Sequence, residues 1–393
     1  MKQFYFVFVL VFLMTSLSPF QVHAEGATKI GTPAIKSDAV ILVDANTGSI
    51  LYEKNSRTQM YPASLTKMAT AIYAIEKGNL DDVVSVSANA YETDGTRVYL
   101  EEGEQVTLKH LIQGLLINSG NDAGVALAEH LNGDIKSFAK SLNQYLIEKI
   151  GVEQTHFTNP HGLFDENHYT TAYDLALITK YALKNPVFRE IFGTKELAWD
   201  GESWDTTLFS HHLMLRGEIP YEGITGGKTG FVQESRYTLS TSAEQGDLSL
   251  IAIVLKAERD EDAYEDTVAL LDYGFENFEI SEVAANKKFY GEQNESYHLN
   301  KPLPYTQKKN ENVQLAMNDQ GVLQVLGDDG RQLAAKQLKM DMPKEAMGTR
   351  AEIDPDELSK KNHLPAILML VFLSVGVVFL QKTIKNMKKK HLT

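Results

Sequence analysis

Hydrophobic positions follow two different periods through the first three quarters of the chain. Alternating or continuous branched apolar residues predict strands over 39–43, 49–53, 237–239 and 248–255. Apolar residues at a spacing near 3.6 predict helices over 62–77, 108–118, 123–131, 135–150, 172–183 and 261–275. Strands near both ends around a helical middle predict an α/β sandwich in which the terminal strands share one antiparallel sheet.

The pattern changes after about residue 284. Short alternating segments at 314–317 and 322–326, with a turn at 328–330, predict a small all-β module. Residues 349–363 are polar and acidic, as expected of a linker.

Two apolar runs lie at the ends of the chain. Lys2, an apolar run over 4–17 and a small residue at Ala24 are typical of a secretory signal over 1–24. The run 364–380 would span about 26 Å as a helix, near the lower limit for crossing a bilayer. Lysines cluster after it, and positive charge marks the cytoplasmic side of a membrane.

These ends predict an exported body held by a C-terminal transmembrane helix over 364–380, with a basic cytoplasmic tail over 381–393. The alternatives are an N-terminal membrane helix that is not cleaved and a buried core helix over 364–380. Pro19 and the shortness of the first run favour the signal, and the lysine cluster favours the membrane helix.

Composition excludes several classes of site. The 393 residues include no cysteine, so disulfides, thiolate zinc sites and a cysteine nucleophile are excluded. The formal charge of −14 argues against a nucleic-acid binder, and without the six lysines of the two ends residues 25–363 carry −20. Four histidines have spacings that match no usual zinc pattern, so we expect structural roles for them and neither a metal nor another cofactor: His161, His168, His211 and His212.

Ser64 and Lys67 place a hydroxyl and an amine three residues apart at the start of a predicted helix. Residues i and i+3 share a helix face, so the lysine nitrogen can reach the serine oxygen. A neutral lysine could accept the serine proton, provided that burial or positive charge lowers its pKa. By itself the pair is common, and taken alone it is better explained by a capped helix with an exposed lysine.

Ser119-Gly120-Asn121 lies between two predicted helices and forms a tight turn. Its serine could relay protons and its asparagine could hold an amide. A plain connection between helices is the alternative.

Lys228-Thr229-Gly230 precedes a predicted strand in a glycine-rich segment. A phosphate-binding loop is excluded on spacing, because Glu222 stands where its first glycine is needed. An edge strand that pairs with an extended peptide and holds its carboxylate remains possible, as does a hairpin with a surface lysine.

The three motifs together, in this order, are typical of penicillin-binding proteins and class A β-lactamases. Residues 36–280 resemble the D-alanyl-D-alanine carboxypeptidase family, the low-molecular-mass penicillin-binding proteins. Segments 61–67, 159–163 and 168–175 also resemble this family closely. It implies a β-lactamase/transpeptidase-like catalytic domain over 36–280 after a linker over 25–35, a β-rich stalk over 281–348, and membrane attachment at the C-terminus.

The resemblance also implies roles for the three motifs. Ser64 would form an acyl-enzyme with the penultimate D-alanine of a peptidoglycan stem peptide, with Lys67 as general base. Ser119 would carry a proton to the leaving amine, and Asn121 would hold the substrate amide.

The last motif would bind the substrate. Lys228 would act electrostatically, Thr229 would bind the substrate carboxylate, and Gly230 would leave its backbone accessible. The backbone amides of Ser64 and Phe231 would form the oxyanion hole. β-Lactam antibiotics would acylate the same serine and inhibit.

The chain departs from the family at Val232, where threonine is frequent, and at Ser235-Arg236, where small residues are frequent. These changes concern substrate preference. A β-lactamase would need a deacylating glutamate, and the candidate positions hold Ala128 and Ala139. A DD-endopeptidase and a non-catalytic wall-binding sensor are further alternatives.

Overall fold

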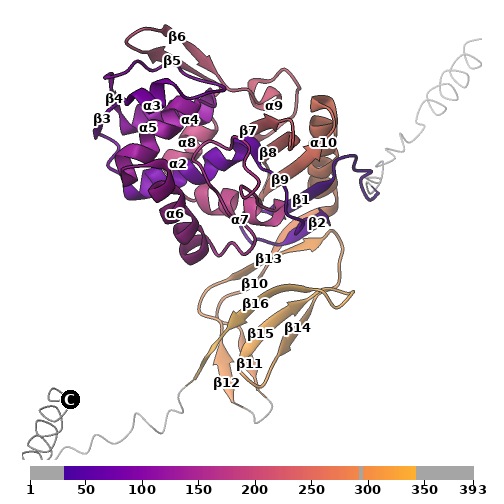
Figure 1. Cartoon of the computed structure of the whole chain (residues 1–393). Coiled ribbons are helices and arrows are strands. Elements are labelled where there is room, and N and C mark those ends of the chain that lie inside the picture. The colour runs from indigo at the N-terminus through magenta and orange to yellow at the C-terminus, as the bar shows by residue number, and fades with distance from the viewer. Residues whose placement is uncertain (1–30, 292–294, 342–393) are drawn as a thin grey trace, which may run out of the picture. The chain divides into compact units, whose positions relative to one another are not determined.

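The computed structural model describes residues 31–291 and 295–341. Its centre is a five-stranded antiparallel sheet in the order β2-β1-β9-β8-β7 (Figure 1). The strands are β1 (Ala39–Asp44), β2 (Ile50–Lys54), β7 (Ile224–Val232), β8 (Arg236–Gln245) and β9 (Leu248–Ala257). β1 therefore pairs with β9, the last strand of this sheet along the chain, as the sequence predicts.

The sheet is buried on both faces, which explains the continuous apolar runs of β1 and β9. On one face, Ile41 and Ile253 join the core formed with the helical region. On the other, Val40 and Val254 pack in a second core under α10 (Asp260–Asn277).

The helical region lies between β2 and β7 in the sequence and covers one face of the sheet (Figure 1). Its helices are α2 (Thr66–Lys77), α3 (Ala88–Tyr91), α4 (Leu108–Ile117), α5 (Asn121–Asn132), α6 (Ile135–Tyr145), α7 (Ala172–Ala182) and α8 (Pro186–Phe192), with the short turns η1 (Ala63–Leu65) and η2 (Leu146–Ile150). Two hairpins, β3 (Val83–Ser85) with β4 (Gln105–Thr107) and β5 (Glu196–Asp200) with β6 (Asp205–Phe209), complete it. The short helix α9 (Leu213–Arg216) packs instead through Met214 in the second core, with α10.

Short strands follow α10 and build a separate small core around Leu323 and Val325. They are β10 (Phe278–Val283), β11 (Lys288–Tyr290), β12 (Ser296–His298), β13 (Leu303–Lys308), β14 (Gln314–Met317), β15 (Val322–Leu326), β16 (Gln332–Gln337) and β17 (Lys339–Met340). Thr306 of β13 donates a hydrogen bond to the buried carboxylate of Asp44 at the end of β1 (2.7 Å). A polar contact thus joins this β-rich region to the central sheet.

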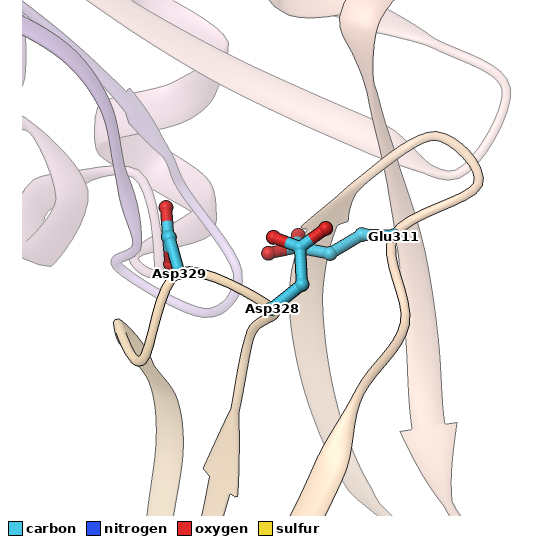
Figure 2. Close-up of side chains that lie close together, drawn as sticks. All are labelled: Glu311, Asp328 and Asp329. Carbon is cyan, nitrogen blue, oxygen red and sulfur yellow. The ribbon is translucent and has the colours of Figure 1, made fainter.

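Three carboxylates gather in the β-rich region: Glu311, Asp328 and Asp329 (Figure 2). Arg331 forms ion pairs with two of them, since its Nη2 donates to Glu311 (2.9 Å) and its Nε lies 3.5 Å from Asp329. The backbone N–H of Arg331 also donates to Asp329 and lowers the pKa of that carboxyl. Glu311, Asp329 and Arg331 therefore form an ion-pair network that ties the turn before β16 to the segment before β14.

The fold-class prediction is wrong in one part. Among residues 31–291 and 295–341, no helix is long and apolar enough to cross a membrane. The expected C-terminal transmembrane helix is therefore no part of the described fold. Its segment 364–380 lies outside the described residues, as do the predicted signal over 1–24 and the tail over 381–393.

Candidate active site

Ser64 and Lys67 meet at the start of α2. Ser64 lies in η1, the turn that leads into the helix, and Lys67 lies in the first turn of α2. The Nζ of Lys67 lies 2.8 Å from Ser64 Oγ and donates to the carbonyl oxygen of His161, also at 2.8 Å. Lys67 has 0 % of its surface exposed. The exposed-lysine alternative is therefore wrong.

Burial controls the charge of this lysine. Desolvation lowers the pKa of Lys67 well below 10.5, and the positive charge of Lys228 lowers it further, while Asp122 opposes the shift. A lysine that loses its proton this easily can act as a base toward a hydroxyl at hydrogen-bond distance.

The residue before the nucleophile is strained. Ala63 has a φ of 47°, a backbone conformation that is uncommon for a residue with a side chain. Gly162 packs directly on it, and a Cβ at Gly162 would overlap the carbonyl oxygen of Ala63. Such strain persists only where the surroundings over-determine it, and it clusters at functional sites.

Ser119-Gly120-Asn121 forms the turn between α4 and α5, and both polar residues are buried. Ser119 has a φ of 62°. Asn121 donates its backbone N–H to Thr96 O and its side-chain amide to Asp94 O, both at 2.7 Å. The turn is thereby joined to the segment that precedes β4.

Asp122 is a site residue that the sequence analysis missed. Its buried carboxylate accepts hydrogen bonds from the backbone N–H groups of Val98 (3.0 Å) and Leu100 (3.2 Å). Tyr99, between them, has a φ of 57° and a half-exposed ring. The one signal in the sequence was an acidic residue directly after Asn121. The groups that it binds lie more than twenty residues away, so nothing in the sequence indicates these contacts.

Lys228-Thr229-Gly230 lies on β7, an edge strand of the sheet. Lys228 is buried, and desolvation lowers its pKa to about 7. Gly230 passes so close to the nucleophile that a Cβ there would lie 2.8 Å from the backbone nitrogen of Ser64. Phe231, the next residue, has an exposed ring.

The fold thus brings the first and third motifs into contact through Gly230 and Ser64. The charge of Lys228, in the third motif, and that of Asp122, directly after the second, both shift the pKa of Lys67. Thr238 of β8 reinforces the arrangement by donating to the carbonyl oxygen of Pro62 (3.1 Å).

Three of the four histidines are buried, and burial lowers the pKa of each to about 3. His168 Nε2 lies 2.8 Å from Thr66 Oγ1, and His212 Nε2 lies 2.8 Å from Thr241 Oγ1. The pKa of His211 is lowered to about 4, first by desolvation of its ring and then by the charge of Lys228.

The two positions considered for a deacylating glutamate lie in the helical core. Ala128 on α5 and Ala139 on α6 are both buried. Neither supplies a carboxylate for the β-lactamase alternative.

Known proteins resemble the chain in sequence and in fold. The family described as D-alanyl-D-alanine carboxypeptidase matches residues 26–259. D-alanyl-D-alanine carboxypeptidase DacF of Bacillus subtilis is 32% identical over 288 residues, which are 71% of this chain and 72% of that protein.

Two solved structures share the fold. Penicillin binding protein 5 from Haemophilus influenzae superimposes with a TM-score of 0.69 and 26% identity, over 79% of this chain and 98% of that chain. Penicillin binding protein 6B from Escherichia coli gives a TM-score of 0.66 and 28% identity, over 79% and 97%. The resemblance found in the motifs is confirmed, and the chain belongs to the D-alanyl-D-alanine carboxypeptidase family of serine peptidases.

Proposed function

We propose that this protein is a serine-type D-alanyl-D-alanine carboxypeptidase, which removes the terminal D-alanine from peptidoglycan stem peptides through an acyl-enzyme on Ser64. The observation that carries the proposal is the buried amine of Lys67, 2.8 Å from Ser64 Oγ. Membership of the family and the names of its relatives agree with this reaction.

Acylation begins when neutral Lys67 takes the proton of Ser64. The serine oxygen then bonds to the carbonyl carbon of the penultimate D-alanine, and the carbonyl oxygen gains negative charge. The backbone N–H groups of Ser64 and Phe231 stabilise this oxygen, and each such donor contributes about 3–4 kcal/mol in better-studied hydrolases.

The tetrahedral intermediate collapses by breaking the carbon–nitrogen bond. The leaving nitrogen receives a proton through Ser119, and D-alanine departs. Asn121 holds the substrate amide during this step. Water then attacks the ester, and the proton returns through Lys67, which regenerates free Ser64.

Substrate binding uses the exposed edge of β7. An extended peptide pairs with an edge strand through its backbone, and alternate side chains then determine specificity. Lys228 and Thr229 hold the free carboxylate of the terminal D-alanine. This requirement for a carboxylate explains why a peptide with a blocked C-terminus is not expected to react.

A penicillin follows the same path as far as the ester. Its leaving nitrogen belongs to a ring and stays tethered after the amide bond breaks, so the acyl-enzyme persists. The protein is thus a target of β-lactam antibiotics.

We also propose that the catalytic body works outside the cytoplasmic membrane. Its substrate is the cell wall, and the signal pattern over 1–24 supports export. Measuring the mass of the mature protein tests this, since cleavage after Ala24 leaves Glu25 as the first residue.

The test of the activity uses the purified full-length protein. Its intact mass is followed after addition of a penicillin, and any adduct is mapped by digestion. A lasting adduct on Ser64 with release of D-alanine from a pentapeptide supports the proposal. Cleavage of cross-linked peptides alone would favour an endopeptidase, and destroyed penicillin without an adduct would favour a β-lactamase.

A further inference from the structure

His168 and Thr66 form a buried hydrogen-bonded chain that ends at the strained peptide before the nucleophile. Thr66 Oγ1 donates to the carbonyl oxygen of Ala63 at 2.9 Å. His168 Nε2 lies 2.8 Å from the same hydroxyl. Ala63, with its φ of 47°, directly precedes Ser64.

The proton positions along this chain follow from the partners. The backbone N–H of Thr158 donates to His168 Nδ1 (3.1 Å), so Nδ1 is the acceptor and the ring proton lies on Nε2. That proton is donated to Thr66 Oγ1, which leaves the threonine proton for Ala63 O. Each hydrogen bond in this series thus has a defined donor and a defined acceptor.

The histidine ring is held in place and stays neutral. It has 1 % of its surface exposed and stacks on Phe157, with ring centroids 4.9 Å apart. Burial lowers the pKa of His168 to about 3, so the ring keeps a single proton at neutral pH. A charged ring would donate from both nitrogens and would lose the bond from Thr158.

The hydrogen-bonded chain ends at the peptide that joins Ala63 to Ser64, so it can affect the position of the nucleophile. The carbonyl oxygen of Ala63 also accepts the backbone N–H of Thr66, which sets the geometry of η1. The direction of the Ser64 N–H, a proposed oxyanion donor, follows from the orientation of the Ala63 peptide, because one peptide plane contains both groups. The hydroxyl of Thr66 therefore fixes the turn that presents Ser64.

We propose that His168 is a positioning residue, which acts through Thr66 to hold the Ala63 peptide and so aligns Ser64 for acylation. The inference rests on the proposed function, because it concerns the rate at which Ser64 is acylated. His168 does not touch the substrate in this proposal. The alternative is a histidine that only fills the core.

Two pairs of variants separate these roles. Thr66→Val removes the hydroxyl at nearly constant shape, and Thr66→Ser keeps it. His168→Phe removes the donor, and His168→Gln keeps an N–H that can reach Thr66. His156→Phe is the matched control, since His156 lies in the same segment but is exposed.

The measurements are the acylation rate by a fluorescent penicillin, kcat and KM for D-alanine release, and the melting temperature. Loss of alignment predicts that Thr66→Val and His168→Phe acylate about 10- to 100-fold more slowly, with KM nearly unchanged. Thr66→Ser and His168→Gln stay within about threefold of wild type. The double variant Thr66→Val/His168→Phe is no slower than Thr66→Val, because the histidine acts through the hydroxyl.

A folded His168→Phe protein that acylates at the wild-type rate overturns the proposal, and so do losses that multiply in the double variant. If His168→Phe does not fold, equal rates for Thr66→Val and Thr66→Ser overturn it. Failure of the proposed function is distinguishable, because the wild-type protein itself would then form no adduct on Ser64.

Discussion

Gly230 lies against the backbone of Ser64, so the edge strand and the nucleophile turn share one contact. A Cβ at Gly230 would come 2.8 Å from Ser64 N and 2.6 Å from Thr238 Oγ1. The backbone of β7 can approach the nucleophile this closely only because residue 230 has no side chain.

Replacing this glycine tests the contact. Gly230→Ala pushes β7 away from Ser64 and displaces the oxyanion donors, so we expect acylation by penicillin to fall about 100-fold. Gly31→Ala is the control, because a Cβ at Gly31 meets nothing within 4 Å. A folded Gly230→Ala protein that is acylated at the wild-type rate would contradict this role of the contact between Gly230 and Ser64.

Lys228 is expected to set the pH range of the reaction through Lys67. Its charge is the second cause, after burial, of the lowered pKa of Lys67. Lys228→Met removes that charge, so Lys67 keeps its proton to higher pH and the acidic limb of the acylation profile moves to higher pH. The exposed Lys140→Met variant should leave the limb in place.

The wild-type protein should also lose affinity for its substrate in alkaline solution. The pKa of Lys228 is lowered to about 7, so its positive charge is lost as the pH rises through that value. A neutral lysine attracts the substrate carboxylate less, and KM for D-alanine release should therefore rise above pH 7. A KM that stays constant from pH 6 to pH 9 would show that the Lys228 charge does not hold the substrate.

Asp122 is expected to stabilise the wall of the site. Asp122→Ala leaves the buried N–H groups of Val98 and Leu100 without this acceptor, which should lower the free energy of unfolding by about 3 kcal/mol. Urea unfolding measures the change. Asp81→Ala, an exposed substitution, should alter it by less than about 0.5 kcal/mol, and equal values for the two variants would refute the role of Asp122.

Asp262 of α10 pairs with Lys36 and Arg259 and should contribute to stability only above acidic pH. Hydrogen bonds from Arg259 and from Lys36 lower the pKa of its carboxyl. A lowered carboxyl pKa stabilises the fold above the unfolded value of 3.8, and this contribution is lost as the pH falls through the folded value.

Asp262→Asn should therefore unfold at lower urea concentration than wild type at pH 7, and the difference should shrink below about pH 4. Unfolding curves from pH 7 to pH 2 test the sign. A difference that grows in acid would exclude this linkage.

Several elements follow from local sequence alone. The periodic apolar positions of α4, α5 and α7 identify those helices, and the apolar runs of β1 and β9 identify strands buried on both faces. In contrast, β8 extends over Arg236–Gln245 although its sequence is rich in Ser and Thr. Pairing with β7 and β9 buries these polar side chains, and the predicted strand over 237–239 was therefore too short.

The residue types and their order along the chain already indicate which reaction the site can perform. Three short motifs identify the family by their side-chain types and order, and they contain the candidate site residues Ser64, Lys67, Ser119, Asn121 and Lys228. Local spacing alone also places Lys67 beside Ser64, because three residues make about one helical turn.

Whether those groups can react depends on contacts that form only when the chain folds. The burial of Lys67, the charge of Lys228 beside it and the approach of Gly230 to Ser64 depend on residues far apart in the chain. Asp122 and His168 act on partners in other segments, and no short motif records those contacts. A pKa and a strained turn are set by surroundings that exist only in the folded protein, whereas side-chain type and helical spacing are present in the chain itself.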